Sequence, residues 1–173
     1  MANLVFGGYF SSRLVENIRE DKGYTYGAHS YFEFTKDSAT VLVEADTASG
    51  VTPAAFWETR YELGRLVLSP PSASEVENAR QYAIGSLLTS TSSQSGLCAT
   101  LVALGAMGMS YEWLRDQPLR IAAVTAEQVA EAAEQHFAPT RFTGIVGVRD
   151  PEPSLLPLLR LSCWPVKLRN ADV

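Results

Sequence analysis

The chain has 173 residues and a mass of 18.8 kDa, which suits one domain with a sizeable core and is short for two. Hydrophobic residues make up 46% and charged residues 19%, so the composition excludes a disordered acidic chain and a collagen-like chain. The net charge of −5 and the scattered Lys and Arg residues argue against nucleic acid as a partner.

Nothing in the sequence predicts a membrane or export segment. No apolar run approaches the roughly 18–20 residues that cross a bilayer, and the first eight residues lack the basic and apolar regions of a signal peptide. We therefore expect no membrane partner, and the cellular compartment stays open. Two cysteines, Cys98 and Cys163, are too few for a disulfide framework or a four-thiolate metal site, so free thiols are expected.

The first part of the chain predicts a helix followed by a hairpin. Apolar side chains recur every four residues over residues 3–20, which is a helical period. The Gly7–Gly8 pair inside this stretch is unfavourable in a helix and requires a packing reason. Residues 27–34 and 39–46 each alternate between apolar and polar side chains, so they predict two antiparallel strands.

Two further stretches predict helices of different character. Thr52 as N-cap and Pro53 at the first helical position predict a helix that ends near Leu68. The stripe expected to be buried on it consists of Trp57, Tyr61, Gly64 and Leu68. Residues 96–108 are almost all small or apolar, which predicts a helix buried against its neighbours.

Two capping boxes predict helix starts later in the chain. They pair Ser72 with Glu75 and Thr125 with Gln128. Between these helices we expect a short helix over residues 111–124 that Pro118 disturbs, and after them a last strand over residues 142–148. The predicted organisation is one domain over residues 1–149, followed by a tail over residues 150–173 for which the sequence predicts no structure.

Local motifs indicate no catalytic centre or metal site in this chain. Neither H-E-x-x-H nor its reversal occurs, and the G-x-S-x-G and phosphate-binding glycine motifs are also missing. His29 and Glu33 share one face of the first strand, but four residues of strand separate them by about 13 Å, too far to ligate one ion. His136 lies in the last turn of its helix, where a cation offsets the helix dipole.

One long stretch is more specific. Residues 6–27 read FGGYFSSRLVENIREDKGYTYG, which resembles the motifs G-G-x-x-S-S-R-L and L-R-E-x-x-G-x-x-Y of the C-terminal, non-zinc half of the pitrilysin/insulinase family of zinc metallopeptidases. That family includes the mitochondrial processing peptidases. The matching residues are Gly7, Gly8, Ser11, Ser12, Arg13, Leu14, Arg19, Glu20, Gly23 and Tyr26, with Ile18 in place of the motif's leucine. Residues 74–80 and 122–129 also resemble phrases of the family.

This resemblance implies an α+β fold. The expected architecture is an antiparallel sheet of about three strands, covered on one face by helices, which forms one half of a processing-peptidase-like clamshell. Because the chain starts on the first helix, the family's first strand is missing from this half. The sheet edge left open could pair with another chain, such as a second copy, to form a homo-oligomer.

The resemblance also implies a division of labour between two halves. In the family, an N-terminal half holds zinc through the motif H-x-x-E-H, and the C-terminal half closes the chamber around a peptide substrate. The C-terminal half presents an arginine and a tyrosine to the substrate, which correspond here to Arg19 and Tyr26. We therefore expect this chain to carry no zinc and no catalytic residue of its own. It should be inactive without a zinc-bearing half, in the same polypeptide or as a separate subunit.

Two alternatives stay open on the sequence alone. Arg19 could instead stabilise the end of its helix, and Tyr26 could pack at the edge of the strand. The chain as a whole could be a non-catalytic assembly subunit, like those relatives of the processing peptidases that serve as scaffolds.

Overall fold

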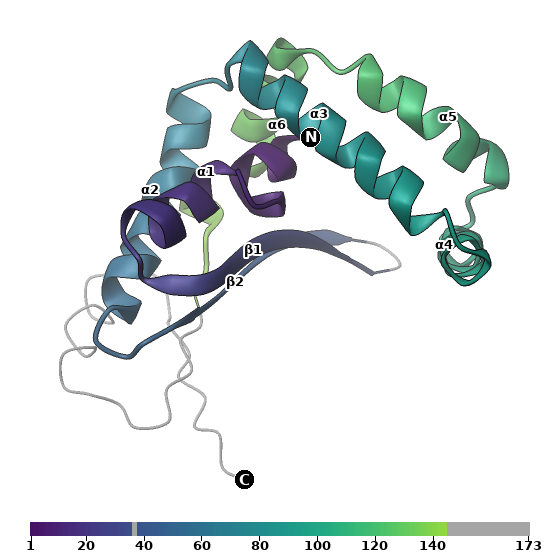
Figure 1. The fold of residues 1–173 in the computed structure, drawn as a ribbon. Coiled ribbons are helices and arrows are strands. Elements are labelled where there is room, and N and C mark those ends of the chain that lie inside the picture. Colours follow the sequence, from purple (N-terminus) through teal and green to yellow (C-terminus); the bar gives the residue numbers. More distant parts are fainter. Residues whose placement is uncertain (36–37, 145–173) are drawn as a thin grey trace, which may run out of the picture.

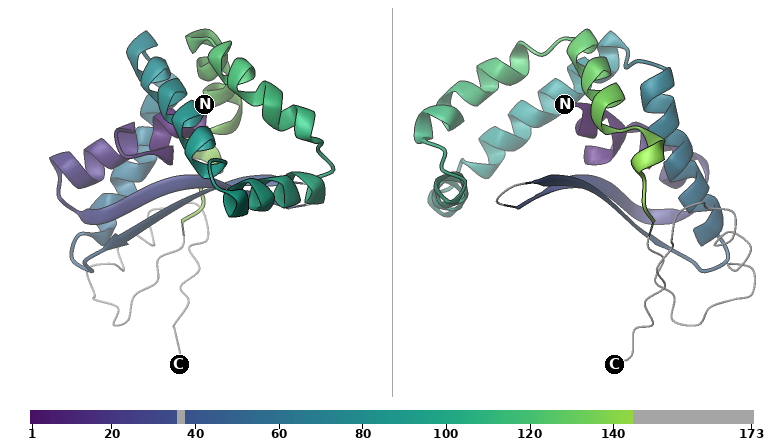
Figure 2. Two further views of the ribbon diagram at one scale, coloured as in Figure 1. Left: turned by 45° about the vertical axis from the view of Figure 1, so that its right-hand side comes forward. Right: turned by 180° about the vertical axis from the view of Figure 1, so that it is seen from behind.

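The structure, a computed structural model, describes residues 1–35 and 38–144. It has the predicted α+β fold, in which helices cover one face of an antiparallel hairpin (Figures 1 and 2). The N-terminal segment comprises η1 (Leu4–Gly8), α1 (Arg13–Val15) and η2 (Glu16–Asp21), and the hairpin comprises β1 (Thr25–Phe34) and β2 (Ala39–Thr47). The elements that follow are α2 (Thr52–Leu68), α3 (Ala73–Ser90), α4 (Gln94–Ala106), α5 (Tyr111–Ala122), α6 (Ala126–His136) and the 3-10 turn η3 (Pro139–Arg141).

The hairpin is covered by helices over only part of its length. On the helix-facing side of β1, Ala28 and Ser30 are buried, whereas Phe32 and Phe34 on the same face are 42% and 63% exposed. The strands β1 and β2 pair as predicted, and they are the two strands of the sheet in the described residues, where about three were expected. Residues 142–144 belong to no strand, and the rest of the strand predicted over 142–148 lies outside the described residues, as does the predicted domain boundary at residue 149.

The single helix predicted over residues 3–20 is wrong, because the structure divides it into two helical segments. Tyr9 is extended, with φ −155° and ψ 173°, and Ser12, at φ −88° and ψ 156°, precedes the second segment. The first segment ends in Gly7–Gly8, where each glycine in a helix interior costs about 1 kcal/mol relative to alanine. The break lets each segment place its own apolar face in the core.

Gly7 allows the first segment to approach the sheet closely. A Cβ atom at Gly7 would lie 2.7 Å from the Ser30 Oγ atom, closer than non-bonded atoms can pack. The Ser30 hydroxyl donates to Asn3 Oδ1 at 2.7 Å, and Asn3 Nδ2 donates to the Ser30 carbonyl at 3.0 Å. The packing reason that the sequence required for the glycine pair is therefore present at Gly7.

The helix α2 has the predicted length but a different start and a different buried face. Its N-cap is Val51, and the hydroxyl of Thr52 donates to the Ala48 carbonyl at 3.1 Å instead of capping. The predicted stripe is wrong, since Trp57, Tyr61 and Leu68 are 37%, 60% and 85% exposed. The residues that face the core are Ala55, Thr59, Glu62, Leu63 and Leu66.

Both predicted capping boxes are confirmed. The backbone N–H of Glu75 donates to Ser72 Oγ at 3.2 Å, and the Ser72 N–H donates to Glu75 Oε2 at 2.8 Å. Thr125 and Gln128 form the same reciprocal pair at the start of α6. Pro118 lies within α5 without ending it.

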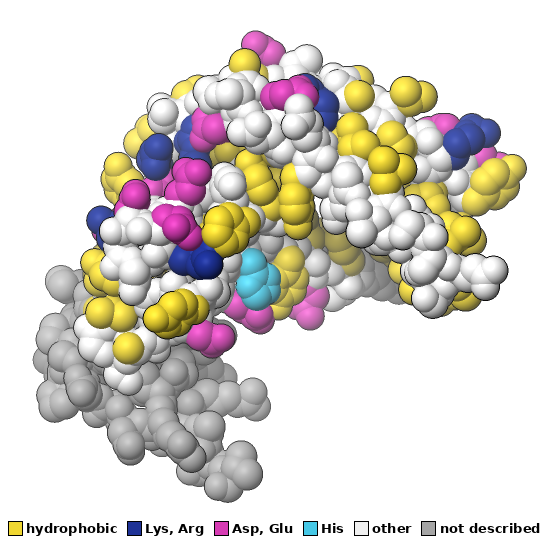
Figure 3. Space-filling view, viewed as in Figure 1, with side chains coloured by type: hydrophobic (Ala, Val, Ile, Leu, Met, Phe, Trp, Pro, Cys, Tyr) yellow, Lys and Arg dark blue, Asp and Glu magenta, His cyan; other side chains and the backbone are white. Residues whose placement is uncertain are grey.

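The helix α4 forms as predicted, but its predicted burial is wrong. Of its residues only Leu104 is buried, while Leu97, Leu101 and Val102 are 40%, 40% and 66% exposed. The helix lies at the end of the helical arch, away from the N-terminal segment (Figure 1), and Figure 3 shows mostly apolar and uncharged side chains at that end.

Within the described residues no single helix meets the length and hydropathy needed to span a membrane; α4 and α5 meet them only jointly, with a bend of 100° between them.

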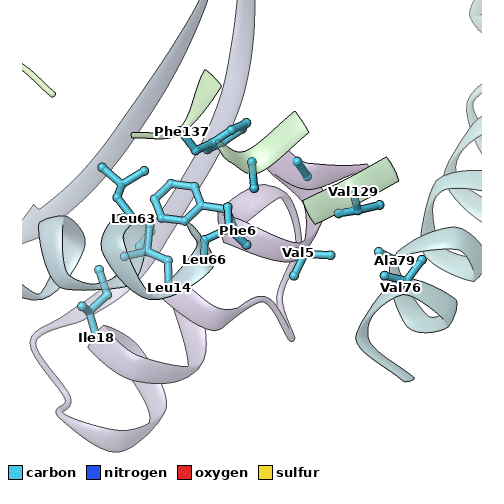
Figure 4. Close-up of a cluster of buried hydrophobic side chains, with 13 residues drawn as sticks. Val5, Phe6, Leu14, Ile18, Leu63, Leu66, Val76, Ala79, Val129 and Phe137 are labelled. Carbon is cyan, nitrogen blue, oxygen red and sulfur yellow. The ribbon is translucent and has the colours of Figure 1, made fainter. Parts of the chain in front are cut away.

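The core lies where the N-terminal segment meets α2, α3 and α6. Its buried side chains come from all four and from Phe137 at the end of α6. Figure 4 shows Phe6, Leu14, Ile18, Leu63, Leu66, Val76, Val129 and Phe137. The rings of Phe6 and Phe137 meet edge to face, with centroids 5.8 Å apart. This core holds the N-terminal segment in place. It thereby positions the end of η2 and the start of β1, where the candidate site lies.

Candidate substrate-contacting site

Arg19 and Tyr26 lie at the two ends of one tight connection, from the last turn of η2 to the start of β1. Gly23 makes this connection at φ 63°, the left-handed region that favours glycine. The backbone N–H of Gly23 donates to the Arg19 carbonyl at 3.1 Å, and that of Tyr24 donates to the Ile18 carbonyl at 2.8 Å. These two bonds close the end of η2, and β1 begins two residues after Gly23. Both predicted site residues therefore lie at the same end of the hairpin.

The guanidinium of Arg19 lies at the surface over an aromatic ring. Its Cζ atom is 4.2 Å from the centroid of Phe10, and Nη1 is 3.1 Å from Glu20 Oε1. The side chain is 29% exposed, and Phe10 is 59% exposed. A cation over a ring gains about 0.5–1 kcal/mol at such a site, and an exposed ion pair gains less than about 1 kcal/mol. These contacts orient the guanidinium and leave it partly exposed.

Tyr26 projects fully into solvent, with a side chain that is 99% exposed. The cause is a β-bulge: Thr25 pairs with Thr47 and Ala28 pairs with Ala45, so Tyr26 and Gly27 together oppose the single residue Asp46. Regular alternation would place Tyr26 on the same face as Ala28, toward the helices. The bulge turns it outward, so the alternative that Tyr26 packs at the strand edge does not fit the structure.

Arg13, the arginine of the S-S-R-L motif, has a structural position. It is 6% exposed, and its guanidinium donates to Glu75 Oε1 at 2.5 Å through Nε and to Oε2 at 3.0 Å through Nη2. Its Nη1 also donates to the Ser69 carbonyl at 2.8 Å. Hydrogen bonds from Arg13, reinforced by those from Ser72, lower the pKa of Glu75 from 4.5 to about 2. This pair ties the N-terminal segment to the start of α3.

A second polar cluster fixes η2, the helix that carries Arg19, to α2. Asn17 Nδ2 donates to Oε1 of the fully buried Glu62 at 2.7 Å, and Arg65 Nη1 donates to the same oxygen at 3.1 Å. Lys22 Nζ lies 3.3 Å from Glu58 Oε1 at the edge of this cluster. No local pattern in the sequence signals these contacts, because they join segments about forty residues apart. The contact of Arg19 with Phe10 was also not predicted, because it depends on the break that divides the N-terminal segment.

The histidines and the described cysteine belong to no group of metal-ligating side chains in the part of the chain that the structure describes. His29 is exposed, with Nε2 3.6 Å from Glu44 Oε2 across the hairpin, and His136 occupies the last turn of α6 as predicted. Cys98 is exposed, and Cys163 lies outside the described residues. Over residues 1–35 and 38–144, no three His, Cys, Asp or Glu side chains are grouped so that they could hold a metal ion. The described residues therefore do not fit a zinc site.

Comparison with known proteins supports the same family that the motif predicts. Residues 1–82 match the family model described as the peptidase M16 inactive domain. Residues 1–82 are therefore homologous to the M16 inactive domain. Over 91 residues it is 32% identical to the uncharacterized zinc protease YmxG of Bacillus subtilis, an alignment that covers 53% of this chain and 22% of that protein.

Solved structures have the same fold as this chain. A peptidase M16 inactive domain from Pseudomonas fluorescens superposes with a TM-score of 0.69 at 25% identity, over 78% of this chain and 32% of that chain. An inactive peptidase domain from Bordetella parapertussis superposes with a TM-score of 0.67 at 19% identity, over 79% of this chain and 74% of that chain. The chain thus spans about a fifth of the Bacillus relative and about a third of the Pseudomonas chain, and its similarity is to the inactive half.

Proposed function

We propose that this chain is the substrate-binding half of a zinc metalloendopeptidase, closing the chamber in which a zinc-bearing N-terminal half cleaves peptides. The homology to M16 inactive domains and to a protein named a zinc protease supports the proposal. The observation that carries it is the placement of Arg19 and Tyr26. Both lie at one end of the hairpin, where Tyr26 is fully exposed and Arg19 is partly exposed, while the neighbouring Arg13 is buried and bonded within the fold.

The chemistry of the two side chains suits peptide hydrolysis. As water adds to a peptide carbonyl, the carbonyl oxygen becomes negative, and the Tyr26 hydroxyl can donate a hydrogen bond to it. The guanidinium of Arg19 stays charged and can hold a second substrate carbonyl in place. The exposed fraction of Tyr26 leaves its hydroxyl free for this contact. Because the described residues do not fit a zinc site, the metal is assigned to the other half.

The test uses this chain assembled with its zinc-bearing half and a fluorogenic peptide. Tyr26→Phe and Arg19→Ala should each lower turnover by roughly tenfold or more, since one lost oxyanion donor typically costs 10²–10³ in rate. The zinc content of the assembly should not change. Matched controls are Tyr31→Phe, a partly exposed tyrosine of the same strand, and Arg60→Ala, a guanidinium 5.7 Å from the ring of Trp57 on α2. Both controls should retain full turnover.

Three outcomes separate the proposal from its rivals. Full turnover in both Tyr26→Phe and Arg19→Ala would remove the site assignment. A partner half without the motif H-x-x-E-H would favour a scaffold subunit. Chelator-sensitive hydrolysis by the purified chain alone would contradict the division of labour. The proposal also includes pairing of a sheet edge that no other strand covers in the described residues with a second copy of the chain, which sedimentation velocity would detect as a dimer.

A further inference from the structure

The β-bulge that exposes Tyr26 is held by one buried side chain. Thr25 is 6% exposed and lies at the first rung of the hairpin, opposite Thr47. Its Oγ1 atom accepts a hydrogen bond from the Gly27 N–H at 3.0 Å, and its one proton lies within donating distance of two carbonyls, that of Asp46 at 2.6 Å and that of Gly27 at 2.8 Å. The hydroxyl thus contacts both strands at the place where two residues of β1 oppose one of β2.

This hydroxyl replaces ladder contacts that the bulge disrupts. An extra residue in one strand leaves backbone groups without their regular cross-strand partners, and a buried unpaired donor or acceptor costs about 1–3 kcal/mol. Thr25 provides a partner for one N–H of the bulged strand and for the facing carbonyl of β2. With these groups satisfied, the bulge is favoured over the regular ladder that would turn Tyr26 toward the helices.

We infer that Thr25 is a positioning residue for the proposed substrate contact, which it supports through Tyr26 by stabilising the bulge with its hydroxyl. The inference rests on the proposed function of Tyr26. Thr25 is buried beneath the strand and touches no substrate itself. Its hydroxyl determines the fraction of molecules in which the tyrosine projects outward and can reach a developing oxyanion.

The decisive experiment is a double-mutant cycle in the assembly with the zinc-bearing half. Thr25→Val keeps the branched shape and removes the hydroxyl, and it should lower kcat about fivefold to tenfold, as expected for losing one hydrogen bond that fixes a catalytic geometry. Thr25→Ser should restore most of the loss. In a Tyr26→Phe background, Thr25→Val should change kcat less than about twofold, because residues that act as a unit are not additive.

The control and a second readout separate positioning from folding. Thr47→Val removes a hydroxyl from the same rung, one that bonds Thr52 Oγ1 rather than the bulge, and it should leave kcat unchanged. In the full chain, hydrogen exchange at the Gly27 amide should be about fivefold faster in Thr25→Val, with the global unfolding temperature little changed.

Each result bears on a different claim. If Thr25→Val lowers kcat equally in the wild-type and in the Tyr26→Phe background, Thr25 has a structural role and the inference is overturned. Wild-type kcat in Thr25→Val while Tyr26→Phe is impaired would also overturn it, and so would unchanged exchange at the Gly27 amide. Wild-type kcat in Tyr26→Phe would instead remove the substrate contact proposed for Tyr26, and the inference with it.

Discussion

The ion pair between Arg13 and Glu75 predicts how the stability of the chain depends on pH. Glu75→Gln is the informative change because the single amide oxygen of glutamine can still accept from the Ser72 N–H, while the charge and one of the two acceptor oxygens that face Arg13 are lost. The mutation therefore isolates the contribution of one carboxylate to the junction between the N-terminal segment and α3.

The magnitude follows from the pKa of Glu75. Hydrogen bonds from Arg13 hold this pKa at about 2 in the folded chain, against 4.5 for an ordinary glutamate. At 1.36 kcal/mol per pH unit, the full difference corresponds to about 3.4 kcal/mol. Because the side chain is 33% exposed, solvent screening reduces the expected stabilisation to about 1–2 kcal/mol. A lowered folded-state pKa means that this stabilisation is present above pH 4.5 and is lost as the pH falls toward 2.

Urea unfolding followed by circular dichroism, from pH 7 to pH 2.5, measures this difference. Wild type should exceed Glu75→Gln by about 1–2 kcal/mol at pH 7, and the two stability curves should converge below pH 4.5. Glu134→Gln, an exposed change on α6, serves as the control and should follow wild type at every pH. Parallel curves for wild type and Glu75→Gln across the acid range would refute the assignment of the low pKa to this pair.

Two further predictions concern packing. Gly7→Ala should destabilise the chain by about 1–3 kcal/mol, because the new Cβ atom would lie 2.7 Å from Ser30 Oγ. Gly85→Ala in α3, where no atom lies within 4 Å of the new Cβ atom, should stabilise the chain by about 0.4–1 kcal/mol. Thermal unfolding measures both changes, and two changes of the same sign would contradict the close approach at Gly7. On α4, Val102→Lys should change the free energy of unfolding by less than about 0.5 kcal/mol and Leu104→Ala should cost about 2–4 kcal/mol. A large loss from Val102→Lys would show that this face is covered in the folded chain.

Local signals in the sequence determined most of the element boundaries. The two capping boxes and Pro53 fixed three helix starts to within a residue or two, because caps act through hydrogen bonds between neighbours in the chain. Alternating side chains over 27–34 and 39–46 identified the hairpin, since the period of a strand is also local. The motif over residues 6–27 identified the family.

Burial was less predictable because it depends on which elements meet. The helix α2 has more than one stripe with helical spacing, and the side that became the core is the one on which the N-terminal segment packs, through Leu63, Leu66 and the buried Glu62. Composition predicted a buried α4, yet among the described residues little besides α3 lies against it, so most of its apolar side chains are exposed.

The candidate site likewise combines features that the local sequence determines with features that depend on tertiary contacts. The sequence by itself determined that an arginine and a tyrosine stand seven residues apart across a glycine turn, because residue identity and the left-handed turn are properties of the local chain. Only the tertiary structure decided where these side chains point. Arg19 rests on Phe10 from the preceding break, and Tyr26 faces solvent because β2 pairs with β1 through a bulge. Pairing register and contacts between distant segments are set by the whole fold, and a one-residue change in register reverses the face on which a strand side chain lies.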